Sequence, residues 1–254
     1  MLRFDEVKFS EALYDFVMLL PNNKVPSEFL PFLRGGKITA LEKEDGSVRP
    51  VVPTEWPSRL LGRAICRARA AEISAGLVPL QLGVGVNDSA SLMAQAVRRH
   101  LIANGDHVVL LVDIVNAFGS ISRDAIRRSV VDMGFSWLLP TFDQLYGGHA
   151  AHSVPMSNGR VAQVAQVEGV NQGCPLGPVL FAVGLHPALK KASAAAEASG
   201  TSVFAYLDDG AIVGELDSVI AVFHVFVEAA RKVGLEVNFA KTKVLMGEIG
   251  RAHV

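Results

Sequence analysis

The sequence has 254 residues, of which 50% are hydrophobic, with a mean hydropathy of +0.32 and a formal net charge of −1. These values exclude a wholly disordered chain and allow one large domain or two small ones. They also exclude the overall basic excess that nucleic-acid-binding proteins usually show, although a local basic face is compatible with them.

Several sequence features bear on the compartment. No apolar run reaches the roughly 18–20 residues that a membrane span needs, so we expect no membrane partner. The first six residues, Met1 to Glu6, include acidic residues where a signal peptide has a basic region and an apolar core. Cys66 and Cys174 form no metal-ligand or disulfide pattern. We therefore expect an intracellular, reducing compartment.

The N-terminal region predicts a helix followed by a hairpin. Apolar residues recur at helical spacing from Phe4 to Leu20 and stop before Pro21. Two short β-prone runs, 37–41 and 48–52, lie on either side of Glu44-Asp45-Gly46, which predicts an antiparallel hairpin. The basic residues expected on this hairpin are Lys37, Lys43 and Arg49. Exposed strands often carry basic side chains that prevent pairing at the sheet edge, so these three residues also have a purely structural explanation.

A helix is predicted from Pro57 to Ala75. Arg59, Arg63 and Arg67 lie four residues apart on it, so they form one basic stripe. Nucleic-acid contact is one interpretation of this stripe, and a solvated face is the more common one.

The following segment, Leu80 to Val86, is interrupted by glycines. Its Gly-x-Gly is not completed to a GxGxxG or GK[ST] pattern, so it does not predict a nucleotide-binding loop. Asn87 or Asp88 is expected to cap a helix that ends near Ala103.

A buried strand is predicted after the turn at Asn104-Gly105-Asp106. Residues His107 to Ile114 form a continuous apolar, β-branched run, which is typical of a strand buried on both faces. Asp113 lies near its end. Because an unpaired buried carboxylate costs several kcal/mol, we expect Asp113 to have a partner.

The second half of the chain predicts mostly helices. A helix at 122–133 is expected to expose Arg123, Arg127 and Arg128. The remaining predicted elements are a helix at 137–146, a hairpin of 154–156 and 161–167, a helix from Val179 to about Glu197, a helix capped by Asp217 that ends at Val233, and a strand at 243–246.

The segment Phe204 to Val213 has two adjacent carboxylates, Asp208 and Asp209, between apolar runs. Asp-Gly between β-prone runs is a strong hairpin signal, so both aspartates are expected at or beside a tight turn. Aspartate also favours turns for purely local reasons. Two like charges in such apolar surroundings need a neutralising partner, most simply a divalent metal, and Asp113 is the expected third ligand.

Five motifs, in this order, resemble the fingers and palm of a reverse transcriptase, most closely that of non-LTR retrotransposons. They are Val48-Arg49-Pro50-Val51, Val112-Asp113-Ile114-Val115-Asn116-Ala117-Phe118, Asn171-Gln172-Gly173-Cys174-Pro175-Leu176-Gly177-Pro178, Tyr206-Leu207-Asp208-Asp209, and Gly234-Leu235-Glu236-Val237-Asn238 with Lys241. They resemble the family's xRPI strand, D-I-x-N-A-F box, QG-x-P segment, YxDD box and GLxxNxxK box.

The resemblance implies an α+β right-hand polymerase fold with an antiparallel palm sheet, the carboxylates on one face and helices behind it. The whole chain, 1–254, would be a single fingers and palm unit. The fingers would cover about 24–105 and 122–168, and the palm about 106–121 and 169–254. The chain ends soon after Lys243, so we expect the thumb to be absent.

The resemblance also implies the reaction and its partners: RNA-directed DNA synthesis from dNTPs on an RNA or DNA template with a primer, with two Mg²⁺ or Mn²⁺ ions. Other domains of a longer polyprotein would be further partners, and an active retroelement protein would be nuclear.

The implied residue roles are as follows. The catalytic residues would be Asp113, Asp208, Asp209 and Lys241, and the metal site would involve Asp113, Ile114, Asp208 and Asp209. The nucleotide would meet Lys43, Arg49, Phe118, Gln172 and Gly173, the primer Tyr206, and the template Arg59, Arg63 and Arg67. Without the resemblance, Phe118 would be a core aromatic residue and Lys241 a solvated lysine.

Two departures from the family pattern are visible. The segment after Pro175 is compressed, and Val115 stands where the family commonly has a polar residue. A catalytically silent palm that only binds nucleic acid or protein is therefore the alternative function. An RNA-dependent RNA polymerase is a third interpretation, against which Phe118 argues because RNA synthesis needs room for the 2′-hydroxyl.

Overall fold

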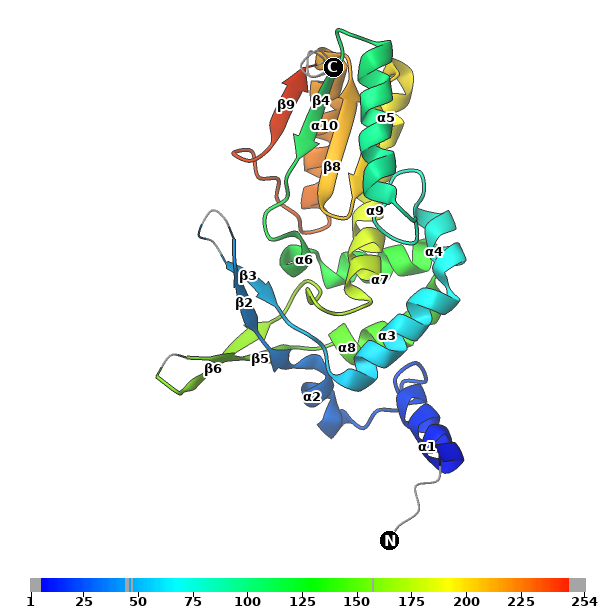
Figure 1. The fold of residues 1–254 in the computed structure, drawn as a ribbon, viewed down its shortest axis with the longest axis vertical. Helices are drawn as coiled ribbons and strands as arrows, with labels where there is room; N and C mark the ends of the chain where they lie inside the picture. Colours follow the sequence, from blue (N-terminus) through cyan, green and yellow to red (C-terminus); the bar gives the residue numbers. More distant parts are fainter. Residues whose placement is uncertain (1–5, 44–45, 47, 157, 247–254) are drawn as a thin grey trace. The chain divides into compact units, whose positions relative to one another are not determined.

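The computed structural model describes residues 6–43, 46, 48–156 and 158–246, and the chain divides into two compact units (Figure 1). Unit 1 comprises Met1–Ala68, Gly134–Val167 and Asn171–Gly177. Unit 2 comprises Arg69–Met133, Glu168–Val170 and Pro178–Val254. These boundaries differ from the expected fingers and palm boundaries, which stay a prediction.

Unit 1 contains two small sheets and several helices. Its helices are α1 (Glu6–Met18), α2 (Leu30–Arg34), α3 (Trp56–Ala68) and α8 (Leu139–Tyr146), and its strands are β1 (Gly36–Lys37), β2 (Thr39–Glu42), β3 (Val48–Val51), β5 (Ala150–Pro155) and β6 (Val161–Gln166). Strands β2 and β3 pair antiparallel, and β5 and β6 form a second antiparallel hairpin. Both hairpins predicted in this region are confirmed, although the first predicted turn lies partly outside the described residues.

Lys37 was expected on the first hairpin, and that expectation is wrong. Strand β1 pairs in parallel with β5, with Lys37 opposite Ser153, so Lys37 belongs to the other sheet. The cause is a long-range pairing that the local sequence does not encode.

The helix predicted from Pro57 to Ala75 is two helices. Helix α3 ends at Ala68, and α4 (Ala70–Leu77) begins in unit 2. Arg69 between them leaves the helical region, with φ −111° and ψ 12°. Alanine and arginine on both sides are good helix formers, so propensity does not indicate this break.

Unit 2 is built on a four-stranded sheet with the order β7-β8-β4-β9. The strands are β4 (Val108–Val112), β7 (Ser202–Tyr206), β8 (Asp209–Gly214) and β9 (Lys243–Met246), and the helices are α4, α5 (Ser89–Ala103), α6 (Ala117–Ser120), α7 (Arg123–Asp132), most of α9 (Gly177–Ala196) and α10 (Leu216–Arg231). Every neighbouring pair in this sheet is antiparallel. The expected α+β fold with an antiparallel sheet is confirmed.

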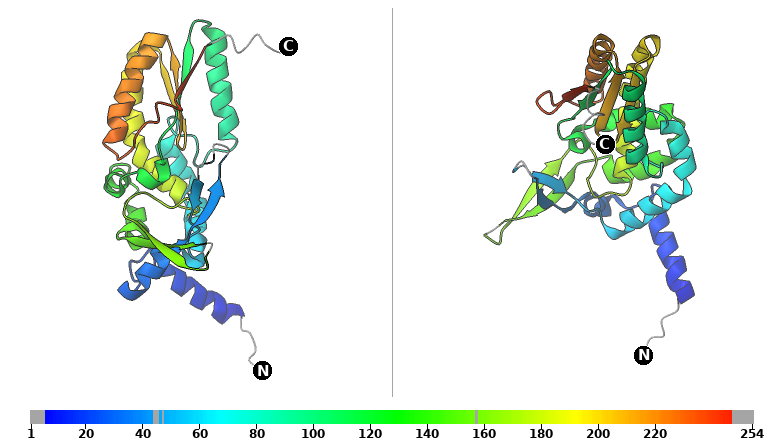
Figure 2. Two further views of the ribbon diagram at one scale, coloured as in Figure 1. Left: turned by 90° about the vertical axis from the view of Figure 1, so that its left-hand side faces the viewer. Right: turned by 45° about the horizontal axis from the view of Figure 1, so that its top comes forward.

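Helices cover both faces of this sheet, which includes the helices expected behind it. Met93, Val97 and Leu101 of α5 pack against a core of Val109, Ala211 and Val213. Helix α10 contacts β4 and β8, and Figure 2 shows it across the sheet from α5. Strand β4 is therefore enclosed, and four of its five residues are buried, as its apolar run predicts.

Arg123 was expected to be exposed, but it is buried at the start of α7. Its backbone N–H donates to Oε2 of Glu168 at 2.8 Å, and its Nε donates to the carbonyl of Gly169 at 3.0 Å. The bond from Nε gives the charged guanidinium a partner, without which its burial would be costly. The periodicity of the helix alone could not indicate these partners.

Two predicted helix caps differ in detail. Asp88 is the N-cap of α5, but its side chain makes no capping hydrogen bond, because the residue is in the left-handed region with φ 51°. Helix α10 begins at Leu216, so Glu215 is its N-cap and Asp217 lies in its first turn.

In the part of the chain that the structure describes, no helix combines the length and the apolar character needed to cross a membrane.

Candidate active site

The two adjacent aspartates lie at the tip of the β7–β8 hairpin. Tyr206 pairs with Asp209, so the two turn residues are Leu207 and Asp208. The Asp-Gly pair is thus not the turn itself, because Asp209 and Gly210 begin β8. Leu207 has φ 55°, since a two-residue hairpin loop needs a positive φ at its first or at both central positions. Such a φ is rare for leucine.

Asp113 lies at the same end of the sheet. Val112, the last residue of β4, pairs with Gly210 of β8. The next residues toward the turn are Asp113 on one strand and Asp209 on the other. Asp113 and Asp208 are half-buried, and Asp209 is exposed. The sheet therefore brings the three predicted carboxylates to one end, although their motifs are far apart in the sequence.

The backbone of Asp113 is held by the segment after α10. The N–H of Asn238 donates to the carbonyl of Asp113 at 2.8 Å, and the hydroxyl of Thr242 accepts from the N–H of Asp113 at 3.4 Å. The same hydroxyl donates to the carbonyl of Asn238 at 2.9 Å. Two of the five predicted motifs thus lie side by side, and Thr242 is a contributor that the sequence did not indicate.

Ile114 and Lys241 lie on these same segments. Ile114 is buried and forms an antiparallel bridge with Val237. Lys241 is exposed, and its backbone N–H donates to the carbonyl of Asn238 at 3.1 Å. Tyr206, the predicted primer contact, is half-buried at the end of β7.

Phe118 lies in α6 inside unit 2. Its side chain is only 8% exposed, and its ring stacks on Phe181 with 4.6 Å between centroids. The ring therefore contributes to the core of unit 2, and contact with a nucleotide sugar stays a prediction.

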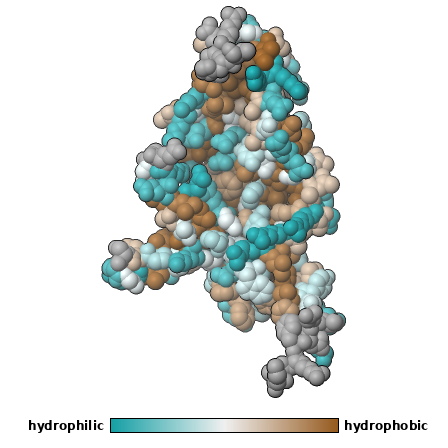
Figure 3. All heavy atoms as spheres, viewed as in Figure 1, coloured by the Kyte–Doolittle hydropathy of each residue, from teal (hydrophilic) through white to brown (hydrophobic). Residues whose placement is uncertain are grey.

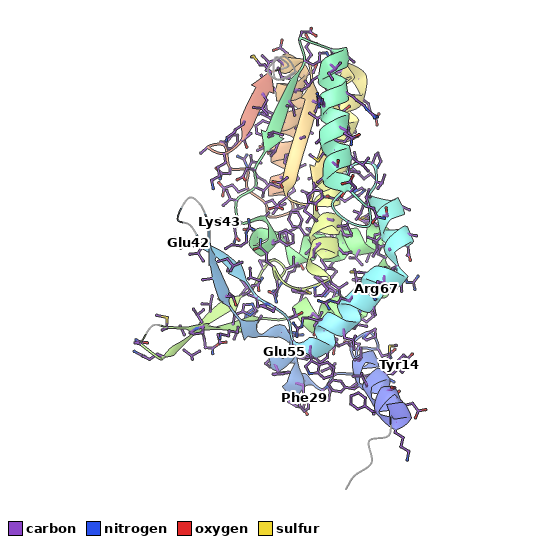
Figure 4. All side chains as sticks on the ribbon, viewed as in Figure 1. Tyr14, Phe29, Glu42, Lys43, Glu55 and Arg67 are labelled. Atoms are coloured by element: carbon purple, nitrogen blue, oxygen red, sulfur yellow. The ribbon has the colours of Figure 1, made fainter. Side chains whose placement is uncertain are left out.

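The other predicted nucleotide contacts belong to unit 1. Arg49 is exposed on β3, and Lys43 is exposed just after β2 (Figure 4). The backbone carbonyl of Gln172 accepts a hydrogen bond from the N–H of Val52 at 2.7 Å. The side-chain Oε1 of Gln172 is buried without a hydrogen-bond partner among the described residues. Gly173 has φ 115°, and a Cβ there would come within 2.9 Å of the carbonyl oxygen of Val52, so a larger residue would be excluded.

The thiol of Cys174, in the same segment, is buried, and burial raises its pKa. A hydrogen bond with the side chain of Tyr146, within unit 1, opposes that rise. The pKa of Cys66 is also raised by its burial. Both thiols are therefore protonated near neutral pH and suit packing rather than nucleophilic chemistry.

The predicted arginine stripe is exposed along α3. Arg59, Arg63 and Arg67 are all exposed, and hydrophilic side chains follow this helix in the space-filling view (Figure 3). The stripe is thus available to an anionic partner.

The carboxylates fit a divalent metal whose coordination is completed by substrate. Among the described residues, no group of three or more His, Cys, Asp or Glu side chains is arranged to hold a metal ion by itself. Asp113 and Asp208 supply hard oxygen donors at one end of the sheet. Mg²⁺ is usually bound through one or two carboxylates, waters and substrate phosphates rather than by a complete protein cage.

Gln81 is a further residue that the sequence interpretation missed. It is fully buried, and its side chain hydrogen-bonds to the backbone of Leu207 in the β7–β8 turn. The available signal was a single polar residue inside the otherwise apolar run from Val78 to Leu82.

Comparison with known proteins agrees with this architecture. The family model described as "Reverse transcriptase (RNA-dependent DNA polymerase)" matches residues 41–251. The "Retrotransposable element SLACS 132 kDa protein" of Trypanosoma brucei gambiense is 29% identical over 218 residues, which cover 84% of this chain and 18% of that protein.

Solved telomerase structures share the fold. The apo telomerase of Candida tropicalis matches with a TM-score of 0.63 and 12% identity, over 97% of this chain and 50% of that one. The telomerase of Candida albicans, in complex with a fragment of telomeric RNA, matches with a TM-score of 0.65 and 12% identity, over 99% of this chain and 47% of that one. The chain thus spans about a fifth of the length of the curated relative and about half of each telomerase chain.

Proposed function

Because this chain belongs to the reverse transcriptase (RNA-dependent DNA polymerase) family, we propose that it catalyses RNA-directed DNA synthesis as part of a non-LTR retrotransposon protein. The observation that carries this proposal is that Asp113, Asp208 and Asp209 lie together at one end of the unit 2 sheet. The likeness to a retrotransposable-element protein supports the retrotransposon assignment.

Nucleotidyl transfer is an in-line displacement in which the primer 3′-oxygen attacks the nucleotide and pyrophosphate leaves. Two Mg²⁺ or Mn²⁺ ions, when bound, supply positive charge that stabilises the attacking and leaving oxygens. Asp113 and Asp208 would hold these ions, with Asp209 as the weaker ligand and Ile114 as part of the site. The hydrogen bonds of Asn238 and Thr242 to the backbone of Asp113 would keep this carboxylate in position.

The remaining roles are assigned within each unit. In unit 2, Tyr206 would contact the primer, Phe118 would select the deoxyribose, and Lys241 would donate a proton to the leaving pyrophosphate. In unit 1, Arg49 and Lys43 would bind the triphosphate through charge-assisted hydrogen bonds. Gln172 and Gly173 would contact the nucleotide, and the exposed stripe on α3 would hold the template.

The partners follow from this reaction: an RNA or DNA template with its primer, and dNTPs. That one of the telomerase structures contains telomeric RNA supports an RNA partner for this fold. Further domains of a longer protein would be additional partners, since the chain corresponds to 18% of its curated relative. An intracellular, nuclear setting follows from the same proposal.

A catalytically silent palm is the second candidate function. It would bind template and primer through the α3 stripe without extending the primer. The departure from the family pattern at Val115 favours it, and the set of three aspartates argues against it.

Primer extension tests the proposal. We expect the chain to extend a DNA primer on an RNA template with dNTPs in the presence of Mg²⁺, and to stop when EDTA is added. NTPs should be used poorly, which would distinguish it from an RNA polymerase. Template binding without any extension, in Mg²⁺ and in Mn²⁺, would instead support the silent palm.

A further inference from the structure

The segment Leu80–Leu82 runs beside β7 in unit 2. The N–H of Ala205 donates to the carbonyl of Leu80, and the N–H of Leu82 donates to the carbonyl of Ala205, both at 2.8 Å. Gln81 and Ala205 form a parallel bridge. This segment therefore extends the sheet beside the strand that leads into the turn of Leu207 and Asp208.

The side chain of Gln81 binds both backbone polar groups of Leu207. Its Oε1 accepts from the N–H of Leu207 at 2.7 Å, and its Nε2 donates to the carbonyl of Leu207 at 3.1 Å. The same Oε1 accepts from the N–H of Gly83 at 3.0 Å. Only one orientation of the amide satisfies all three bonds, because the oxygen faces two donors and the nitrogen faces an acceptor.

Leu207 needs such a partner. Its φ of 55° is a conformation that leucine adopts rarely, and it persists only where the surroundings enforce it. Gln81 is 0% exposed, so water does not compete for its hydrogen bonds. A buried amide held by three hydrogen bonds is a rigid support.

Gly83 brings this support close to the turn. A Cβ at Gly83 would lie 2.7 Å from both the backbone nitrogen and the Cγ of Leu207. The glycine therefore allows the segment to pack directly on the turn. This contact explains why residue 83 is a glycine. The sequence alone indicated no functional site in this segment.

We propose that Gln81 is a positioning residue of the polymerase site, which fixes Leu207 so that Asp208 and Asp209 keep the orientation needed to bind metal. The catalytic consequence rests on the proposed function, whereas the effect on the conformation of the turn does not. Gln81 acts through the backbone of Leu207 and touches no reacting atom.

The test uses Gln81→Met, which keeps the length of the side chain and removes both the donor and the acceptor. A matched control is Gln144→Met in unit 1, since Gln144 is also buried and hydrogen-bonds to Asn23. The readouts are the circular dichroism spectrum, Mn²⁺ binding by electron paramagnetic resonance without nucleic acid or nucleotide, and kcat and KM for primer extension.

We expect Gln81→Met to fold and to bind Mn²⁺ about 10-fold more weakly, because loss of a group that orients a metal ligand typically costs about 10–100-fold in affinity or activity. Its kcat should fall by about 10- to 100-fold with little change in the KM for dNTP. A higher Mn²⁺ concentration should partly restore the kcat of Gln81→Met but not that of Asp208→Asn. The control should match the wild type in metal binding and in kcat.

Folded Gln81→Met with wild-type Mn²⁺ affinity and kcat would overturn the proposal. If Gln81→Met does not fold, Gln81→Asn decides, since it keeps the amide and its neutral charge but shortens the side chain that reaches the backbone of Leu207. That variant should show a smaller loss in the same readouts, and no loss would overturn the proposal. A wild-type chain that binds Mn²⁺ but never extends a primer would refute the proposed function, while Mn²⁺ binding would still test Gln81.

Discussion

Val112 of β4 pairs with Gly210 of β8, and this register determines where the carboxylates meet. One step further along each strand lie Asp113 and Asp209, and Asp208 occupies the turn beside them. A slip of one residue in this pairing would move every side chain of the strand to the opposite face of the sheet. The core of β4 and β8 therefore specifies the position of the site.

Gly83→Ala should weaken the support of the β7–β8 turn. The new methyl group would meet the backbone of Leu207 at 2.7 Å, so we expect a loss of about 1–3 kcal/mol in the free energy of unfolding, as for other overpacked sites. Urea denaturation measures this, and primer extension should fall in parallel. Gly105→Ala is the matched control, because a Cβ there meets nothing within 4 Å. Equal stability of the two variants would show that the contact is relieved without cost.

Phe118→Val tests the predicted selection of deoxyribose. We expect the variant to incorporate ribonucleotides more readily and to lose up to about 3 kcal/mol of stability, because the ring is buried against Phe181. The measurement is the ratio of kcat/KM for dNTP and NTP. Phe181→Val is the control, since it removes the same stacking from the other ring. If both variants relax the selection equally, packing and not contact with the sugar is responsible.

Replacing Arg59, Arg63 and Arg67 with alanine should weaken binding of template and primer. All three side chains are exposed on α3, so the fold should be retained. Each phosphate contact contributes about 0.9 to the slope of log K against log salt for duplex DNA, so the slope should decrease by up to about 3. Fluorescence anisotropy at several salt concentrations measures it. Alanine at Arg98, Arg99 and Arg128, which are exposed in unit 2, is the control. An unchanged slope in the α3 variant would assign this stripe to a solvated face.

The buried thiol of Cys174 predicts a dependence of stability on alkaline pH. Burial raises its pKa in the folded state above the ordinary thiol value, so the unfolded state loses its proton first as the pH rises. Its contribution to stability is therefore fully present below the ordinary thiol pKa and is lost as the pH rises toward the folded value. Urea denaturation of the wild type and of Cys174→Ala at pH 7 and pH 10 isolates this effect. A difference between the two proteins that does not change with pH would contradict it.

Local patterns in the sequence were sufficient for the main features of the site. The apolar, β-branched run before Asp113 predicts an enclosed strand, and the apolar runs around Asp208 and Asp209 predict a hairpin, because strand burial and turn formation depend on neighbouring residues. The order of the five motifs then predicts the family, which the family match confirms.

The features that the sequence did not indicate depend on long-range pairing. Lys37 pairs with β5, Arg123 is buried against Glu168 and Gly169, and Gln81 meets a turn that lies more than a hundred residues later in the chain. In each case the local pattern is that of an ordinary exposed or loop residue. The expected position of Asp208 and Asp209 at or beside a tight turn is confirmed, although the pairing of Tyr206 with Asp209 places the two turn residues at Leu207 and Asp208 rather than at the Asp-Gly pair.

The most direct test of the central claim is primer extension by Asp208→Asn, compared with the wild type at equal concentration in Mg²⁺ and in Mn²⁺. We predict that this variant folds with unchanged or slightly higher thermal stability, because it removes one of several neighbouring negative charges, and that it does not extend the primer. Extension by Asp208→Asn at the wild-type rate would contradict the assignment of this carboxylate to the catalytic site.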